Sequence, residues 1–215
     1  NAIAGVWPID SGKIIIDGTD ITNLPEHKRA KYLGRVFQDP MTGTAATMDI
    51  EENMAIALRR GEKRTLRWGV SREDRELFRE KLQTLGLGLE DRMKNPVGLL
   101  SGGQRQRVWI AMALCQGTKT LFLDEPTTYL DIRYQIEILQ LVKKLNQEFG
   151  ITIIMVLHDI NQAIAYSDNV IGMKDGKVLV EGDPEEVITE ESIRELYGIE
   201  LGVTRVDGRK FVLAV

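Results

Sequence analysis

Two adjacent carboxylates follow an apolar stretch in "TLFLDEP", residues 120–126. In α/β proteins, ligands bind at the edge of the sheet where the parallel strands end. At such an edge Asp124 could hold Mg²⁺, and Glu125 could accept a proton from an attacking water molecule. The same two side chains could instead only cap the turn before Pro126. The residues by themselves leave both interpretations open.

A second candidate is the string "LLSGGQRQRV", residues 99–108. Ser101, Gly102 and Gly103 stand where a helix is predicted to begin, and Arg105 and Arg107 follow on that helix. The unpaired N–H groups of a helix start attract phosphate, and glycine lets the backbone approach an anion closely. The alternative is an ordinary helix capped by serine.

Two further polar residues follow predicted strands. His158 comes directly after "ITIIMVL" and could donate a hydrogen bond to a terminal phosphate, or it could be a structural histidine. Gln38 ends "GRVFQ", where a polar loop residue would be equally ordinary.

The elements around these residues alternate between strand and helix. Strands are predicted at 33–39, at 120–124 and over the apolar "ITIIMVL", which is typical of a buried parallel strand. One helix is predicted from about Gly103 to Leu114. Another begins near Ile132, with an apolar face made of Ile132, Ile136, Leu139, Val142 and Leu145. This order predicts a mainly parallel sheet with helices on both faces.

Residues 40–100 have a different character and are predicted to form a helical insertion. Asp49 and Glu52 have the spacing of a capping box at the start of an amphipathic helix. A second helix is expected where apolar residues recur at helical spacing: Leu77, Phe78, Leu82 and Leu85.

Both ends of the chain are predicted to contain helical and strand segments. "NAIAG" reads as a helix tail before a turn, and "KIIIDGTDI" as a strand closed by an Asp-Gly turn. Near the other end, two hairpins are expected on either side of a helix.

The composition limits the classes of partner and the compartment that the chain is expected to have. The 215 residues carry a net charge of −4 and a pI near 5.4, which argues against a nucleic-acid partner. Cys115 is the single cysteine, so the chain forms no internal disulfide, and we expect it to be a small buried hydrophobe in a reducing compartment. The longest apolar runs are far shorter than the roughly 20 residues of a membrane helix, so a membrane role would need a partner.

Taken together, these strings resemble the ATPase subunit of ABC transporters over essentially the whole chain. "LSGGQ" (100–104) resembles the family signature, and "TLFLDEP" resembles the Walker B strand. "YLD" (129–131) resembles the D-loop, "VLHD" the histidine switch and "FQD" the Q-loop.

The resemblance implies a role for each candidate. Asp124 would hold Mg²⁺ with the help of Gln38, Glu125 would be the general base, and His158 would contact the γ-phosphate of ATP. Gln38 would also sense the hydrolytic water and couple the site to the membrane partner. The remaining residues would contact nucleotide held by a second subunit or lie at that seam: Ser101, Gly102, Gly103, Gln104 and Asp131.

The resemblance also implies a P-loop NTPase-like α/β fold with an inserted α-helical subdomain. Residues 1–39 would be a partial RecA-like core with a remnant of an antiparallel β subdomain, and 40–102 the helical subdomain. Residues 103–182 would complete the core, and 183–215 would form a C-terminal helix and hairpin. Two ATPase subunits would pair head to tail and bind transmembrane permease subunits, peripherally, at the cytoplasmic face of the membrane.

One expected feature is missing from the 215 residues. A P-loop needs Gly-x-x-x-x-Gly-Lys-Ser/Thr, and no such string occurs. We therefore expect an N-terminally truncated ABC ATPase, whether from a partial gene or from a shortened chain. We expect the isolated chain to bind MgATP poorly and to hydrolyse it negligibly.

The transported solute is less well specified. The second half resembles importers of iron–siderophore, haem or cobalamin type, which we favour, whereas the first half resembles importers of amino-acid-like solutes. A non-catalytic regulatory paralogue and a DNA-repair or translation ATPase are further alternatives. Intact Glu125 and His158 argue against the former, and the short insertion argues against the latter.

Overall fold

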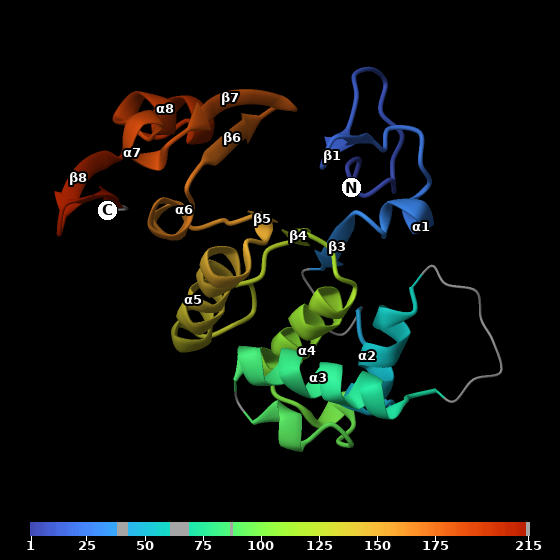
Figure 1. Cartoon of the computed structure of the whole chain (residues 1–215). Coiled ribbons are helices and arrows are strands. Elements are labelled where there is room, and N and C mark those ends of the chain that lie inside the picture. Colours follow the sequence, from blue (N-terminus) through green and yellow to red (C-terminus); the bar gives the residue numbers. More distant parts are fainter. Residues whose placement is uncertain (38–42, 61–68, 87, 214–215) are drawn as a thin grey trace. The chain divides into compact units, whose positions relative to one another are not determined.

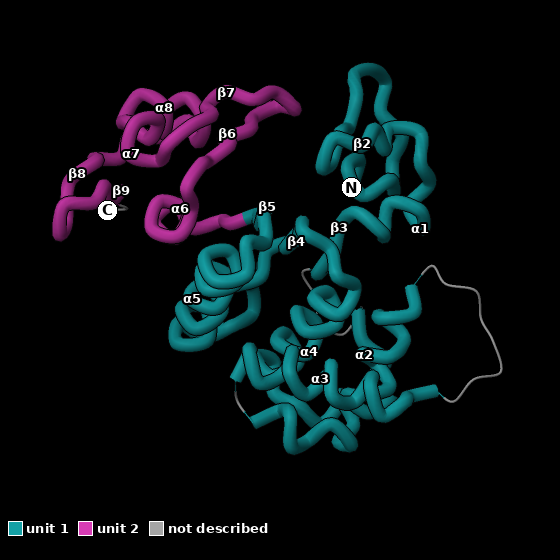
Figure 2. The backbone as a smooth tube through the Cα atoms, viewed as in Figure 1, with its two compact units in different colours: residues 1–156 teal, residues 157–215 magenta. Residues whose placement is uncertain are grey.

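A computed structural model of the chain describes residues 1–37, 43–60, 69–86 and 88–213. It divides into two units, residues 1–156 and residues 157–215, and each is described by itself (Figure 2). Within the described residues, no helix is both long and apolar enough to cross a membrane.

The first unit contains a parallel three-stranded sheet of order β3-β4-β5 (Figure 1). Its strands are β3 (Leu33–Val36), β4 (Thr120–Leu123) and β5 (Thr152–Met155). The register aligns Val36, Leu123 and Met155, so the three strands end at one edge. Asp124 N–H donates to Val36 O (2.9 Å) just past that edge. The parallel sheet predicted from the sequence is therefore present.

Helix α4 (Gly102–Cys115) joins this sheet to the helical insertion. It packs on β3 and also on α2 (Ile50–Leu58) and α3 (Arg72–Leu85) (Figure 1). Val108, Ile110 and Ala111 are fully buried within one continuous core that the sheet and the insertion share. The helix lies close to its predicted position. Cys115 is buried at its end, as expected, and burial raises the pKa of the thiol to about 12.

The helical insertion contains a capping box at the start of α2 and one buried carboxylate. Asp49 and Glu52 form the predicted box at the start of α2. The Glu51 side chain, 2% exposed, pairs with Arg75 on α3 (3.0 Å) and with Lys94. Burial alone raises the pKa of Glu51, but these two cations outweigh burial and hold that pKa below its usual range. Two short 3₁₀ turns complete the insertion: η1 (Leu89–Asp91) and η2 (Val97–Leu99).

Two predictions about apolar faces need correction. Helix α5 (Ile132–Phe149) begins near Ile132 as expected, with Asp131 as its N-cap, but Ile132 is 78% exposed and Ile136 is 36% exposed. Its buried face begins at Ile138, six residues after Ile132, and includes the predicted Leu139, Val142 and Leu145. Strand β5 is not buried on both faces either, because Ile154 is 46% exposed.

Arg107 lies on the predicted helix but in its buried part. It does not face an anion at the helix start but is buried, and it donates to Leu85 O (2.7 Å) and to Glu137 on α5 (2.8 Å). One guanidinium thus links α3, α4 and α5. Burial lowers its pKa, while the carboxylate of Glu137 acts in the opposite direction.

The start of the chain is organised by Arg29, at the end of the short helix α1 (Glu26–Arg29). Its buried guanidinium donates to four backbone carbonyls, those of Ala2, Ile3, Thr22 and Leu24, at 2.6 to 2.8 Å. These bonds join residues 1–6 to the hairpin of β1 (Ile15–Ile16) and β2 (Thr19–Asp20). That hairpin turns at the predicted Asp-Gly pair.

The first six residues have the hydrogen-bond pattern that ends α-helices. Gly5 N–H donates to Ala2 O, and Val6 N–H donates to Asn1 O, with Gly5 at φ +86°. This is the Schellman arrangement, in which a left-handed glycine closes the last turn. It matches the helix tail and turn predicted for "NAIAG".

The second unit is built from short helices and two antiparallel hairpins. The first hairpin pairs β6 (Val170–Lys174) with β7 (Lys177–Gly182), and the second pairs β8 (Gly202–Val206) with β9 (Arg209–Leu213). The helices are α6 (Ile160–Tyr166), α7 (Pro184–Val187) and α8 (Glu190–Tyr197). A small core of Ile164, Ile188, Ile193 and Val212 joins them.

The link between Arg107 and Glu137 gives a stability prediction. Replacing Glu137→Ala leaves a buried guanidinium without its carboxylate, and we expect the free energy of unfolding to fall by about 2 kcal/mol in chemical denaturation. As the control, Glu148→Ala removes an exposed partner of Lys144 on the same helix and should cost under about 0.5 kcal/mol. Equal costs for the two variants would contradict the role given to the buried pair.

Candidate functional site

Asp124 and Glu125 lie where β4 leaves the sheet, as predicted. Asp124 is half exposed, and its Oδ2 is 3.6 Å from the Arg35 guanidinium on the neighbouring strand β3. Arg35 also donates to Asn1 Oδ1 (2.6 Å) and stacks over the ring of Phe37 (4.3 Å). The sheet therefore presents a carboxylate and a nearly buried cation side by side at one edge.

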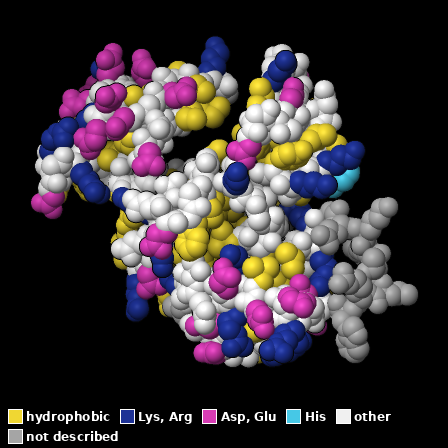
Figure 3. All heavy atoms as spheres, in the orientation of Figure 1, with side chains coloured by type: hydrophobic (Ala, Val, Ile, Leu, Met, Phe, Trp, Pro, Cys, Tyr) yellow, Lys and Arg dark blue, Asp and Glu magenta, His cyan; other side chains and the backbone are white. Residues whose placement is uncertain are grey.

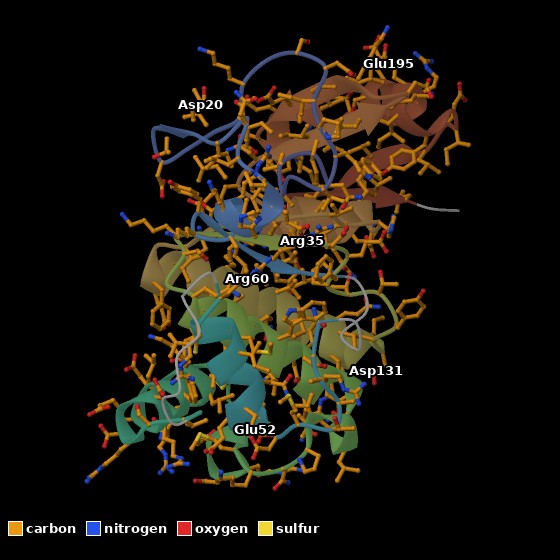
Figure 4. The ribbon with its side chains drawn as sticks, turned by 90° about the vertical axis from the view of Figure 1, so that its right-hand side faces the viewer. Asp20, Arg35, Glu52, Arg60, Asp131 and Glu195 are labelled. Atoms are coloured by element: carbon orange, nitrogen blue, oxygen red, sulfur yellow. The ribbon has the colours of Figure 1, made fainter. Side chains whose placement is uncertain are left out.

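Arg35 was not among the residues singled out from the sequence. A signal was available, because one arginine interrupts the apolar string "LGRVF" inside a predicted strand. A buried arginine in a strand needs a partner, and the register places β4 beside it. Figure 4 shows Arg35 at the level of the sheet and Asp131 in the same unit.

Glu125 has a backbone conformation that is uncommon for its type. Its φ is +48°, in the left-handed region that favours glycine, and Tyr129 follows at φ +63°. Thr128 closes the turn by donating its N–H to Glu125 O and its hydroxyl to Glu125 Oε2, both at 3.1 Å. Such strain persists where surrounding structure fixes it, and it concentrates at functional sites. The turn holds the Glu125 carboxylate in one direction.

The helix start predicted at the signature, residues 100–104, has a complete capping box. Ser101 Oγ accepts from Gln104 N–H (3.3 Å), and Gln104 Oε1 accepts from Ser101 N–H (3.1 Å). Ser101 and Gly102 are exposed, whereas Gly103 is buried. Ser101 therefore caps the helix, and the exposed glycine beside it leaves the backbone accessible.

The structure brings the signature close to Asp131. A Cβ on Gly102 would lie 3.6 Å from Leu130, and one on Gly103 would lie 3.0 Å from the Tyr134 ring. Asp131 caps α5 by accepting from Tyr134 N–H (3.2 Å). Two capped helix starts therefore lie side by side, and a larger residue at 103 would require the Tyr134 ring to shift.

Two predicted site residues remain, His158 and Gln38. His158 is exposed and belongs to the second unit, one residue before Asp159, the N-cap of α6. Gln38 lies outside the described residues.

The metal expectation depends on Asp124. Within the described residues, no group of three or more His, Cys, Asp and Glu side chains could form a protein cage for a metal ion. Mg²⁺ in nucleotide sites is usually bound through one or two carboxylates plus substrate phosphates and water, so a single accessible carboxylate fits it. On the face seen in Figure 3, cationic and anionic side chains are interspersed over the helical insertion.

Comparison with known proteins decides the family. The family model for the ABC transporter matches residues 1–128, well over half of the chain. The chain belongs to the family of ABC transporter ATP-binding proteins.

Individual members of the ABC family support this assignment. The chain is 42% identical over 201 residues to the petrobactin import ATP-binding protein FpuC of Bacillus anthracis, covering 93% of the chain and 71% of that relative. It is 36% identical over 199 residues to a tyrosine transport ATP-binding protein of Clostridioides difficile, covering 92% of the chain and 79% of the relative. The structure of CbiO1 from Clostridium perfringens, part of an ABC transporter complex, matches with a TM-score of 0.74 at 32% identity. This match covers 90% of the chain and 74% of CbiO1, and it agrees with the α/β fold expected for the ABC family.

The cap and ligand functions of Ser101 can be separated. Asp is as good an N-cap as Ser, so Ser101→Asp should leave the melting temperature of this ABC protein nearly unchanged, whereas Ser101→Ala should lower stability by about 1 kcal/mol. Thermal unfolding measures both. Equal loss in the two variants would mean that the hydroxyl does more than cap the helix.

Proposed function

We propose that the chain is the ATP-binding subunit of an ABC importer and that the sheet edge at β4 is its hydrolytic centre. The observation that carries the proposal is the pair Asp124 and Glu125, the latter held by Thr128 in a strained turn. A fixed carboxylate next to a metal-binding carboxylate is what a water-activating base requires.

Each residue has a distinct role in this proposal. Asp124 would hold Mg²⁺, which would neutralise charge on the β- and γ-phosphates, and Arg35 would limit the accumulation of negative charge there. Glu125 would accept the proton of the attacking water. His158 would donate a hydrogen bond to the γ-phosphate, and Gln38 would orient water beside the metal.

The signature would act on nucleotide bound by a second copy. Ser101 and Gly102 are exposed at a capped helix start, a geometry that favours phosphate oxygens. Asp131 lies beside them, so a head-to-tail pair of ATPase subunits would bury both. Permease subunits would bind such a pair at the cytoplasmic face of the membrane, and residues 40–102 would be the docking subdomain.

The phosphate-binding loop is a separate part of the proposal. Residues 1–215 contain no Gly-x-x-x-x-Gly-Lys-Ser/Thr string, so these residues alone lack the main backbone donors to the β- and γ-phosphates. We infer that they bind MgATP weakly and hydrolyse it negligibly without such a loop.

Two solute classes have support. The second half of the chain and the 42% identity to a petrobactin import protein favour an iron–siderophore importer. The first half and the 36% identity to a tyrosine transport protein favour an amino-acid importer as the second candidate. A non-catalytic regulatory role is disfavoured because a subunit without catalysis has no chemical need for Glu125 in a strained turn.

The test compares residues 1–215 with an extended chain in which a strand and a Gly-x-x-x-x-Gly-Lys-Ser/Thr segment precede Asn1. Titration calorimetry with MgATP should show binding by the extended chain only. In the extended chain, Glu125→Gln should lower kcat by about a hundredfold or more and leave ATP binding intact, because only proton transfer is removed.

Glu73→Gln, an exposed glutamate on α3, is the matched control and should leave kcat unchanged. Tight MgATP binding by residues 1–215 would overturn the inference about the missing loop. Full activity of the Glu125→Gln variant would overturn the assignment of the base.

A further inference from the structure

The amide side chain of Asn161 bonds the C-terminal hairpin of the second unit to α6. Val212 N–H on β9 donates to Asn161 Oδ1 (2.8 Å), and Asn161 Nδ2 donates to Val212 O (3.0 Å). The amide thus pairs with the backbone of β9 as a neighbouring strand would. The two residues are 51 positions apart in the chain.

The same asparagine lies in the first turn of α6. Asp159 caps this helix, and its Oδ1 accepts from Asn161 N–H (2.8 Å) and from Gln162 N–H (3.1 Å). His158 immediately precedes this cap. The turn that follows His158 is therefore fixed by its own cap on one side and by β9 on the other.

Burial makes the connection rigid. Val212 is 1% exposed and packs with Ile164 of α6 in the core of the unit. An amide pair at the edge of a core is costly to break, because both backbone groups would lose their partners away from water.

Other side chains hold the hairpin without reaching the first turn of α6. Glu185 of α7 accepts from Lys210 N–H (2.8 Å), and Glu190 of α8 accepts from Val203 N–H (3.3 Å). The pair at Asn161 links the hairpin to the turn beside His158.

We propose that Asn161 is a positioning residue for His158. By bonding to the C-terminal hairpin, Asn161 would fix the turn of the backbone that follows His158. The inference rests on the proposed function, in which His158 acts on the γ-phosphate. A histidine that must meet one phosphate oxygen needs a fixed backbone, because a misplacement of about 1 Å can cost about a hundredfold in rate.

The first measurement is amide hydrogen exchange at Val212 in residues 1–215. Asn161→Ala should speed exchange at this amide by about tenfold or more, because its acceptor is removed. In Asn161→Asp the ionised carboxylate accepts from Val212 N–H but cannot donate to Val212 O. Protection at Val212 in Asn161→Asp should therefore lie between that of the unchanged chain and that of Asn161→Ala.

The second measurement is ATP turnover by the extended chain. Asn161→Ala should lower kcat by about tenfold and change KM for ATP by less than about twofold, and Asn161→Asp should lose less of kcat because it keeps the acceptor for Val212 N–H. Glu190→Ala loosens the same hairpin from α8 and should leave kcat unchanged.

The outcomes separate the two hypotheses. An extended chain that is inactive, or whose kcat does not depend on His158, overturns the proposed function. An active, His158-dependent chain whose kcat survives Asn161→Ala overturns the positioning inference alone. Equal losses of kcat in Asn161→Ala and Glu190→Ala would also overturn it, because the hairpin would then matter only for stability.

Discussion

The burial of α4 is the constraint on which the first unit depends. Its body is packed against the sheet and the helical insertion at once, and the Trp109 ring contacts Phe37 at 5.5 Å between centroids. A helix held on several sides in a dense core cannot rotate or slide without opening cavities. Its capped start at Ser101 is therefore held in place, and the exposed Gly102 is presented to any ligand from a rigid base. The positions of Ser101 and Gly102, which the proposed nucleotide contact requires, therefore depend on this packing.

The turn after β4 shows a different balance between stability and function. Glu125 and Tyr129 both have left-handed backbones, and each such residue costs of order 1 kcal/mol or more. The bonds from Thr128 and the cap at Asp131 hold the turn in spite of this cost. Two strained residues in five are hard to explain by stability alone, whereas a fixed carboxylate direction explains them.

Local patterns in the sequence predicted much of this structure. The capping box of Asp49 with Glu52 and the glycine pair at the start of α4 are encoded within a few residues, and both were predictable. The exposure of Ile132 was not, because helical spacing identifies an apolar stripe but not the turn at which a neighbour begins to cover it. Arg107 shows the same limit, since its acceptors come from helices distant in the chain.

Local sequence patterns do not predict hydrogen bonds between residues that are far apart in the chain. The Asn161 amide binds a backbone 51 residues away, and nothing in the residues around it marks that partner. Arg35 is intermediate, because its place inside an apolar strand signals an unusual environment but not the identity of Asp124. The arrangement of residues in the proposed function depends on these contacts as much as on the motifs.

The most direct test of the account mixes two proteins that should each be inactive. One is the chain of residues 1–215, which has an intact signature and no P-loop string. The other is the extended chain carrying Ser101→Asp, whose P-loop is intact but whose signature would repel phosphate. If the signature of one subunit completes the site of the other, the mixture should hydrolyse ATP although neither protein does so alone. A mixture that stays inactive, under conditions in which the unmodified extended chain is active, would contradict the composite site.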